Sequence, residues 1–293
     1  MIIMQFYKKD FLVKSDFQLR KQPTTINTNY SSKQLKKELK KVRNELGELQ
    51  NILYAHAKYG VLICFQGMDS SGKDSLIREV FKDFNIRGVV AHSFKKPSEK
   101  ELKHDFLWRH YKALPEQGKF SVFNRSHYEN VLISQIHPKI VLNENLPHIN
   151  SVEDITPQFW ETRISQINNF EQTISENGII VMKFFLNISK DEQRQRLLRR
   201  LEKPNKNWKF APEDIEERKL WNQYLDVYED VMRKTSYPHA SWYSIPSDQK
   251  QLSRLIVAKI ILEVMKSYTD IKNPPVTHRV KENLETYMKD LQA

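Results

Sequence analysis

The sequence has a single cysteine, Cys64, so no disulfide can form within its 293 residues. This fits a reducing compartment, and because Cys64 stands in an apolar stretch we expect a core residue rather than a nucleophile. The longest apolar run, 179–186, is interrupted by Lys183 and is too short to cross a bilayer. Residues 1–12 lack the apolar segment of a secretory signal. We therefore expect a cytoplasmic protein with no membrane partner.

Acidic residues are fewer than basic ones: the chain has 36 Asp and Glu and 47 Lys and Arg, which gives a net charge of +11. An excess of this size is typical of proteins that bind polyanions, such as nucleic acid, a phospholipid surface or a phosphate-rich substrate. The alternative is a basic chain whose lysines only keep it soluble. The distribution of the charge along the chain decides between these interpretations.

One short motif, GMDSSGKDS, matches the Walker A spacing of a phosphate-binding loop. Gly67 and Gly72 are followed by Lys73, and in such loops the backbone N–H groups and the lysine surround a chain of phosphates. Asp74 stands where a Ser or Thr hydroxyl normally binds Mg²⁺, and a second carboxylate, Asp69, lies inside the loop. A loop that binds phosphates has to accommodate both of these negative charges.

Apolar segments of strand length alternate with segments of helical periodicity. The predicted strands are 61–67, 89–94, 119–123, 179–186 and 241–246. This alternation predicts an α/β fold with a doubly wound, mostly parallel sheet, in which ligands bind at the carboxyl ends of the strands. The Walker A motif and the polar segments after the other strands would meet there.

The rest of the chain divides by its periodicity. We predict an N-terminal arm over 1–32, extended and partly mobile, a kinase-like domain over 33–270, and a C-terminal tail over 271–293 with one surface helix. A helix from Ser32 carries an apolar stripe, which would pack on the chain's own core or on the same helix of a partner. Further helices are predicted over 98–111, 157–177, 212–235 and 251–268, and a loop over 134–155.

The polar segment NRSHYEN follows the third predicted strand, where a Walker B acid usually stands. That position holds Asn124, so Asp69 and Glu129 are the candidate carboxylates for Mg²⁺, directly or through water. Arg125 offers the planar donors that clamp phosphate, although a surface ion pair with Glu129 is the alternative. Lys73 would neutralise charge on the transferred phosphoryl group.

A basic segment follows the fourth strand, over about 194–212, with Glu202 as its only acid between Arg194 and Lys209. Nucleotide kinases carry a mobile lid at this place, which closes over the phosphates and excludes water. On the other side of the expected cleft, Trp108, Arg109 and the SFKKPS turn would receive a second nucleotide, although Trp108 could equally be a core residue. The basic residues of the lid are Arg194, Arg196, Arg199, Arg200, Lys203, Lys206 and Lys209.

The motifs FQGMDSSGKD, LWRHY, FNRSHYENVL, NWKF and SWYSIP together resemble, in order and spacing, the polyphosphate kinase 2 family. The resemblance extends from about Leu35 to Ser267. It implies a P-loop kinase-like three-layer α/β/α fold with a five-stranded parallel sheet and a mobile helical lid. It also implies an enzyme that moves phosphate between inorganic polyphosphate and nucleotides with Mg²⁺, and the NRSHYE form is similar to the class III branch, which accepts nucleoside mono- and diphosphates.

The resemblance also implies roles for individual residues and a purine nucleotide as partner, such as AMP, ADP, GMP or GDP. Asp69, Lys73 and Arg125 would be catalytic, with Asp69 and Glu129 on the metal side. The acceptor nucleotide would contact Lys95, Arg109, Asn124 and Glu129. The chain would form a homo-oligomer, a dimer or tetramer. Polyphosphate would contact Gly67, Ser70, Ser71, Gly72, Lys73, Asp74, Arg125, Arg196, Arg200 and Lys209.

Two other functions are compatible with parts of the sequence. The first is an ATP-dependent nucleoside monophosphate kinase with a thymidylate kinase-like fold. The second is a non-catalytic RNA or polyanion binder that uses the positive charge. The interleaved aromatic side chains of a single-strand binding face are not evident, because Trp108, Trp160, Trp221 and Tyr224 have the spacing of helical core residues. We therefore expect no nucleic-acid partner.

Overall fold

The centre of the molecule is a sheet that is buried on both faces. In the computed structural model, which describes residues 6–293, every residue of β1 (Gly60–Gln66) is buried. A strand with no polar alternation requires a covering layer on each side. The other strands are β2 (Val89–Ser93), β3 (Phe120–Asn124), β4 (Ile179–Asn187) and β5 (Ala240–Pro246). All neighbours are parallel, in the order β2-β3-β1-β4-β5.

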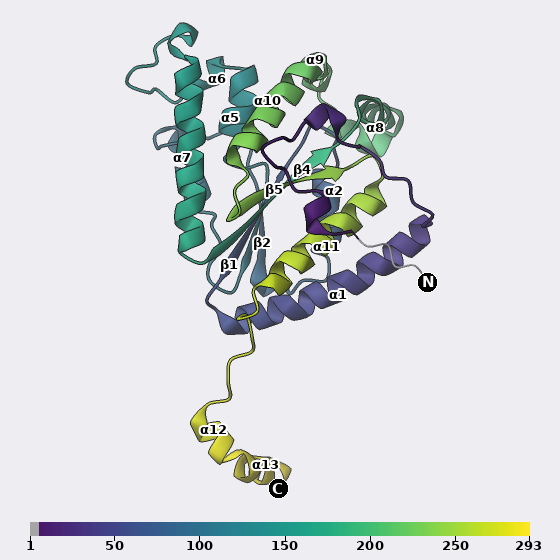
Figure 1. Cartoon of the computed structure of the whole chain (residues 1–293), viewed down its shortest axis with the longest axis vertical. Coiled ribbons are helices and arrows are strands. Elements are labelled where there is room, and N and C mark those ends of the chain that lie inside the picture. The colour runs from purple at the N-terminus through teal and green to yellow at the C-terminus, as the bar shows by residue number, and fades with distance from the viewer. Residues whose placement is uncertain (1–5) are drawn as a thin grey trace.

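Helices cover both faces of this sheet (Figure 1). On one face, α1 (Ser32–His56), α2 (Lys73–Val80) and α11 (Lys250–Ser267) pack over Val61, Ile63 and Phe65. On the other face, α7 (Pro157–Glu176) packs over Leu62 and Cys64. Beside it, α5 (Glu129–Ile136) and α10 (Trp221–Thr235) pack over β4 and β5. The predicted three-layer α/β/α fold with a five-stranded parallel sheet is confirmed.

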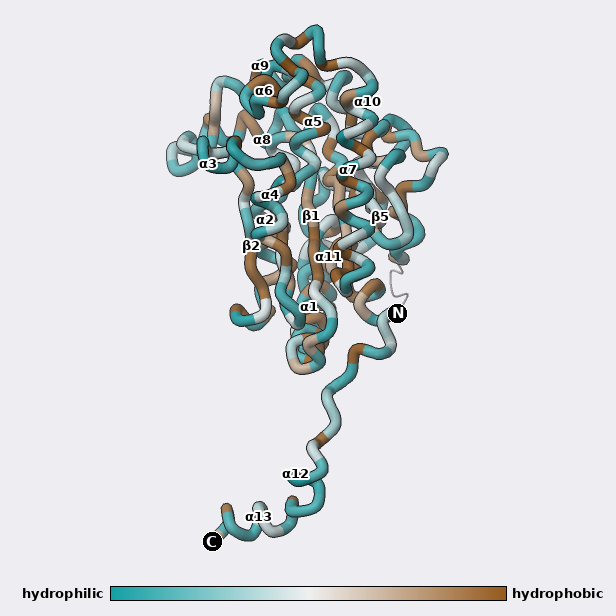
Figure 2. The backbone as a smooth tube through the Cα atoms, turned by 90° about the vertical axis from the view of Figure 1, so that its left-hand side faces the viewer, coloured by the Kyte–Doolittle hydropathy of each residue, from teal (hydrophilic) through white to brown (hydrophobic). Residues whose placement is uncertain are grey.

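The remaining helices are shorter than α1, α7, α10 and α11. Two of them, α12 and α13, lie away from the body of the molecule (Figures 1 and 2). The α-helices are α3 (Glu99–Leu102), α4 (Trp108–Tyr111), α6 (Lys139–Leu142), α8 (Lys190–Glu202), α9 (Glu213–Lys219), α12 (His278–Glu282) and α13 (Leu284–Gln292). The 3₁₀ helices are η1 (Lys8–Asp10), η2 (Leu19–Lys21), η3 (Ile86–Gly88), η4 (Val152–Asp154) and η5 (Pro204–Lys209).

Several helix boundaries differ from the prediction. The helix expected over 98–111 is divided into α3 and α4, and the one expected over 212–235 into α9 and α10, which meet at Leu220. The tail forms two helices interrupted at Asn283 rather than one, and the loop expected over 134–155 contains the end of α5 and all of α6. Periodicity alone does not show such breaks, because both halves of an interrupted helix keep the same apolar spacing.

The N-terminal arm is packed on the body, which corrects the prediction of a partly mobile segment. Phe11, Val13, Phe17 and Leu19 are buried. The Val13 amide donates to the carbonyl of Trp242 at 2.9 Å, and the amide of Ser244 donates to that of Phe11 at 2.8 Å. The arm therefore covers the edge of β5, which would otherwise expose unpaired backbone groups. Its first five residues lie outside the part of the chain that the structure describes.

The apolar stripe of α1 faces the chain's own core. Leu35, Leu39, Val42, Leu46 and Leu53 are buried in the same cluster as the apolar residues of α11. Of the two alternatives for this stripe, the intramolecular one is therefore correct. Within residues 6–293, no helix has both the length and the apolar character that crossing a bilayer requires.

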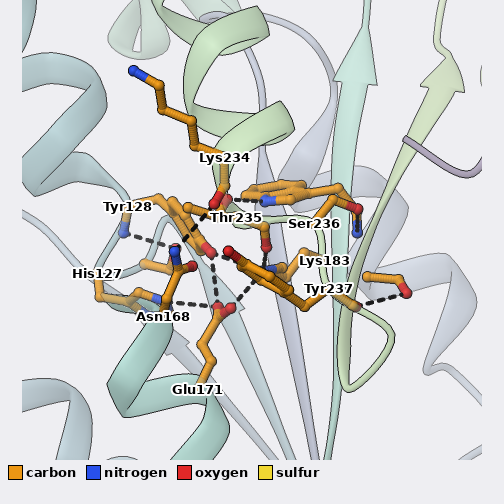
Figure 3. A network of polar contacts seen from close by, with 12 residues as sticks. His127, Tyr128, Asn168, Glu171, Lys183, Lys234, Thr235, Ser236 and Tyr237 are labelled. Atoms are coloured by element: carbon orange, nitrogen blue, oxygen red, sulfur yellow. Dashed lines mark hydrogen bonds and ion pairs between the residues drawn. The ribbon is translucent and has the colours of Figure 1, made fainter. Parts of the chain in front are cut away.

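A buried ion pair joins Lys183 of β4 to Glu171 of α7, on the face of the sheet that α7 covers (Figure 3). The Lys183 ammonium group donates to the Glu171 carboxylate at 2.5 Å, to the Tyr128 hydroxyl at 2.8 Å and to the Thr235 carbonyl at 2.7 Å. The second Glu171 oxygen accepts from Tyr128 at 2.9 Å and lies 3.1 Å from Nε2 of His127. Burial alone would raise the pKa of Glu171, but Lys183 and His127 hold that pKa below its ordinary value.

We expect the Lys183→Met variant to lose about 3–5 kcal/mol of unfolding free energy, because Glu171 would remain buried without its cation. Denaturant titration measures this loss. The double variant Lys183→Met with Glu171→Leu should recover much of it, since no uncompensated charge then remains in the core. A single variant within 1 kcal/mol of the parent chain would contradict this account.

Candidate active site

The Walker A segment forms a loop between β1 and α2, as the spacing predicts. Gly67 has φ of +150° and Gly72 has φ of +105°, values that a residue with a Cβ rarely adopts. A Cβ at Gly67 would also lie 3.0 Å from the carbonyl oxygen of Leu186. The two glycines therefore permit a close turn whose backbone N–H groups lie at the start of α2, the usual position for binding phosphate.

Lys73 opens α2 and folds back over this loop. Its ammonium group donates to the carbonyls of Gly67 at 2.6 Å and Met68 at 3.3 Å. Burial lowers the pKa of Lys73, while the nearby carboxylates, Asp69 first among them, act in the opposite direction. The loop thus holds a buried cation next to the space that anionic phosphates would enter.

The two aspartates of the loop face different partners. Asp74 accepts a hydrogen bond from the side-chain amide of Asn124 at 2.6 Å, and this amide also lies 3.4 Å from the Ser93 hydroxyl. Asp69 instead faces the guanidinium group of Arg125, with 3.4 Å between the charged atoms. Asp74 therefore links α2 to the end of β3 and lines one of the cavities described below, whereas Asp69 lines two of them.

The polar segment after β3 has a strained backbone. Arg125 has φ of +62° and Ser70, in the phosphate loop, has φ of +63°. Left-handed conformations at residues other than glycine cost about 1–3 kcal/mol each and are concentrated at functional sites. The next residues, Ser126, His127 and Tyr128, are completely buried. The Glu171–Lys183 pair holds His127 and Tyr128 and so fixes the position of Arg125 and Glu129 on either side.

Glu129 lies at the start of α5 beside this group of charges. Burial raises the pKa of Glu129 and Asp69 adds to that effect, whereas Arg125 and Lys73 oppose it. A cavity of about 210 Å³, which we call the central cavity, is lined by Asp69, Lys73, Arg125 and Glu129 and closed by apolar and aromatic residues of α5 and α10.

A second cavity, of about 510 Å³, lies between the phosphate loop and the basic segment after β4. We call it the loop–lid cavity. The loop from Asp69 to Ser75 forms one wall, and Arg200, Lys203, Lys206 and Lys209 contribute to the other. Arg200 donates to the carbonyl of Lys209 at 3.0 Å and pairs with Asp214 at 3.1 Å, so it stabilises the turn that presents these lysines.

Arg196, for which the resemblance implies a phosphate contact, lines the loop–lid cavity, and its guanidinium group is bonded to backbone carbonyls there. It is buried, and its Nε donates to Glu192 at 2.7 Å. The guanidinium Nη atoms donate to four backbone carbonyls, those of Ser70, Ser71, Ser247 and Asp248. These five bonds occupy all five N–H groups of an arginine. In this structure Arg196 therefore braces the phosphate loop, and a phosphate contact would require it to release a carbonyl.

A third cavity, of about 410 Å³, lies on the other side of Arg125 and is lined by Phe94, Lys95 and Arg109 among others. We call it the Phe94 cavity. Arg109 donates to the Lys95 carbonyl at 2.8 Å, and its guanidinium carbon lies 5.3 Å from the centre of the Phe94 ring. An aromatic face beside fixed cations suits a base and the phosphates of a nucleotide. Trp108 is half-buried and stacks on His104, with 3.9 Å between the centres of the two rings.

The structure thus brings together most of the residues that the sequence singled out. Arg125 lines all three cavities, Asp69 and Lys73 line the central and loop–lid cavities, and Glu129 lines the central and Phe94 cavities. Gln193 was not predicted from the sequence. Its side-chain amide donates to the backbone carbonyl of Asp69 at 3.0 Å and so positions the loop. No sequence signal marks this contact, because the two residues belong to separate elements.

The fold and this site define a P-loop kinase architecture of the α/β class. A family model described as polyphosphate kinase 2 matches residues 29–273. The chain therefore belongs to the polyphosphate kinase 2 family, and the resemblance noted in the sequence is confirmed.

Individual relatives agree with this assignment. The ADP-polyphosphate phosphotransferase of Rhodopseudomonas palustris is 46% identical over 250 residues, which cover 85% of this chain and 86% of the relative. The AMP/ADP-polyphosphate phosphotransferase of Meiothermus ruber is 41% identical over 224 residues, which cover 76% of this chain and 78% of the relative. The crystal structure of polyphosphate kinase 2 from Arthrobacter aurescens superposes with a TM-score of 0.86 at 31% identity and covers 96% of both chains.

Proposed function

We propose that this chain transfers the terminal phosphoryl group of inorganic polyphosphate to nucleoside mono- and diphosphates, namely AMP, ADP, GMP and GDP, in a Mg²⁺-dependent reaction. The observation that carries the proposal is the position of Arg125, which lines the loop–lid, central and Phe94 cavities at once. A donor in the first and an acceptor in the third would meet beside its guanidinium group. The names of the relatives support polyphosphate as the donor and AMP or ADP as the acceptor.

The reaction is an in-line attack by an oxygen of the acceptor's terminal phosphate on the terminal phosphorus of the polyphosphate chain. A new P–O bond forms, the bridging P–O bond breaks, and the chain leaves one phosphate shorter. Such transfers depend on positioning and charge neutralisation rather than on a covalent nucleophile. Lys73 and the loop N–H groups would hold the donor phosphates, and Arg125 would stabilise the transferring group from the side of the acceptor.

The carboxylates fit a magnesium ion that is bound mainly through substrate. Among residues 6–293, no three or more His, Cys, Asp or Glu side chains are grouped so as to hold a metal. Mg²⁺ usually binds through one or two carboxylates together with phosphates and water. Asp69 and Glu129 face the central cavity and would offer these ligands. The ion, when bound, would neutralise charge on the donor and acceptor phosphates.

An assay of the donor tests this proposal against an ATP-dependent kinase of similar fold. The pure protein is incubated with ADP, Mg²⁺ and polyphosphate, and then with AMP, GMP and GDP, without any other phosphate source. We expect ATP to form from ADP. Activity that appears only when ATP is supplied as the donor for a nucleoside monophosphate would contradict the proposal and favour the alternative.

A further inference from the structure

A fourth cavity adjoins the loop–lid cavity and shares no lining residue with the Phe94 cavity. It has a volume of about 470 Å³ and lies between the end of the N-terminal arm and the first turns of α1 and α11. We call it the arm cavity. Arg199 and Lys250 line both this cavity and the loop–lid cavity, so the two spaces meet at these cations. Figure 1 shows the starts of α1 and α11 on the same side of the molecule as α8.

Three cations, Arg196, Arg199 and Lys250, and two carboxylates, Glu192 and Asp248, line the region where the two cavities meet, so positive charge is in excess there. Glu192 pairs with both Arg196 and Arg199, at 2.7 Å and 3.1 Å. The side-chain ammonium group of Lys250 makes neither a hydrogen bond nor an ion pair with any residue in the described part of the chain. Partial burial and the nearby Arg196 and Arg199 lower the pKa of Lys250 to about 8. An anion at this junction would relieve the repulsion among these three cations.

The positive charge continues from the arm cavity along α1. Ser32 lines this cavity, and Lys36 and Lys40 follow it at steps of four residues, so the three share one row on the helix. Lys33 lies on the adjoining side of the first turn. These three lysines are exposed, and within residues 6–293 none of them is in an ion pair. Lysines of this kind suit a flexible chain of charges, because each can follow a phosphate without a fixed geometry.

We propose that the arm cavity and the row of Lys33, Lys36 and Lys40 form a second binding region for the distal phosphates of a long polyphosphate chain. This inference rests on the proposed function, because it takes the loop–lid cavity as the site of the reacting end. The chain would leave that cavity between Arg199 and Lys250 and run along α1. We expect tripolyphosphate, with its reacting end at Lys73, to make no contact with the α1 lysines, so that the region favours long donors over short ones.

The test compares two triple variants with equal loss of charge. The first is Lys33→Gln, Lys36→Gln and Lys40→Gln, on α1. The matched control is Lys272→Gln, Lys281→Gln and Lys289→Gln, in the C-terminal tail. For the α1 variant we expect KM for long-chain polyphosphate to rise about 3- to 10-fold, with kcat unchanged and KM for tripolyphosphate unchanged. The salt dependence of long-chain KM should also become shallower, with a log–log slope smaller by about 2. The control variant should behave as the parent chain.

An unchanged long-chain KM in the α1 variant would overturn the inference, as would an equal rise for both donor lengths or for both variants. A variant that keeps its long-chain KM but binds a single-stranded RNA oligonucleotide more weakly would assign the lysines to nucleic acid instead. These results are distinct from a failure of the proposed function, in which the parent chain would transfer phosphate from neither donor.

Discussion

Replacing Lys73 by alanine is expected to lower kcat for phosphoryl transfer from polyphosphate by about 10³-fold, while the protein remains folded. Removal of one group that stabilises transition-state charge costs about 10²–10³ in rate, and Lys73 also holds the loop through the Gly67 and Met68 carbonyls. Burial of its charge is itself unfavourable, so we expect the unfolding free energy to change by only about 1 kcal/mol. Initial rates with ADP and polyphosphate measure the effect.

The matched control is Lys82→Ala, which removes an exposed lysine just beyond the end of α2. Its rate should equal that of the parent chain, which separates the position of Lys73 from a loss of net charge. A folded Lys73→Ala variant with near-normal turnover would refute the role assigned to this lysine.

The second large effect is expected from Asp69→Asn, which keeps the shape of the side chain and removes its charge. Asp69 lines both the central and the loop–lid cavity, and its only ion pair within the described residues is the half-exposed one with Arg125. If this carboxylate holds Mg²⁺ between donor and acceptor, turnover should fall about 10²-fold or more, and the Mg²⁺ concentration for half-maximal rate should rise. Both are read from Mg²⁺ titrations of the initial rate.

Asp290→Asn, an exposed site in α13, serves as the control for this experiment. It should leave both the rate and the Mg²⁺ dependence unchanged. An Asp69→Asn variant whose rate falls without any change in Mg²⁺ dependence would place Asp69 in the positioning of Arg125 rather than at the metal.

The sequence was sufficient to predict the sheet and the phosphate loop because both depend on local patterns. A continuous apolar run such as VLICFQG is typical of a strand that is covered on both faces, and the Walker A spacing predicts the turn after it. The site followed from topology, since the carboxyl ends of parallel strands meet at one edge. This is why Asp69, Lys73, Arg125 and Glu129, predicted from separate segments, line adjoining cavities.

What the sequence could not show depends on partners that are distant along the chain. In the sequence Lys183 only interrupts an apolar run, and its role depends on Glu171 and Tyr128, which surround it in the fold. In the sequence Arg196 is one of several basic residues in the lid segment. In the fold its four bonds to backbone carbonyls and its ion pair with Glu192 distinguish it from the lysines of the lid. The arm is held by backbone bonds to β5, whose residues lie more than 200 positions further along the chain, so its packing could not be read from the local sequence.

A crystal structure with long-chain polyphosphate and Mg²⁺ tests the central claim most directly. We expect a row of linked phosphates in the loop–lid cavity, with the reacting end at Lys73 and Arg125 and a magnesium ion bound to Asp69. Density for the chain on a different face of the molecule, with this cavity empty, would contradict the account.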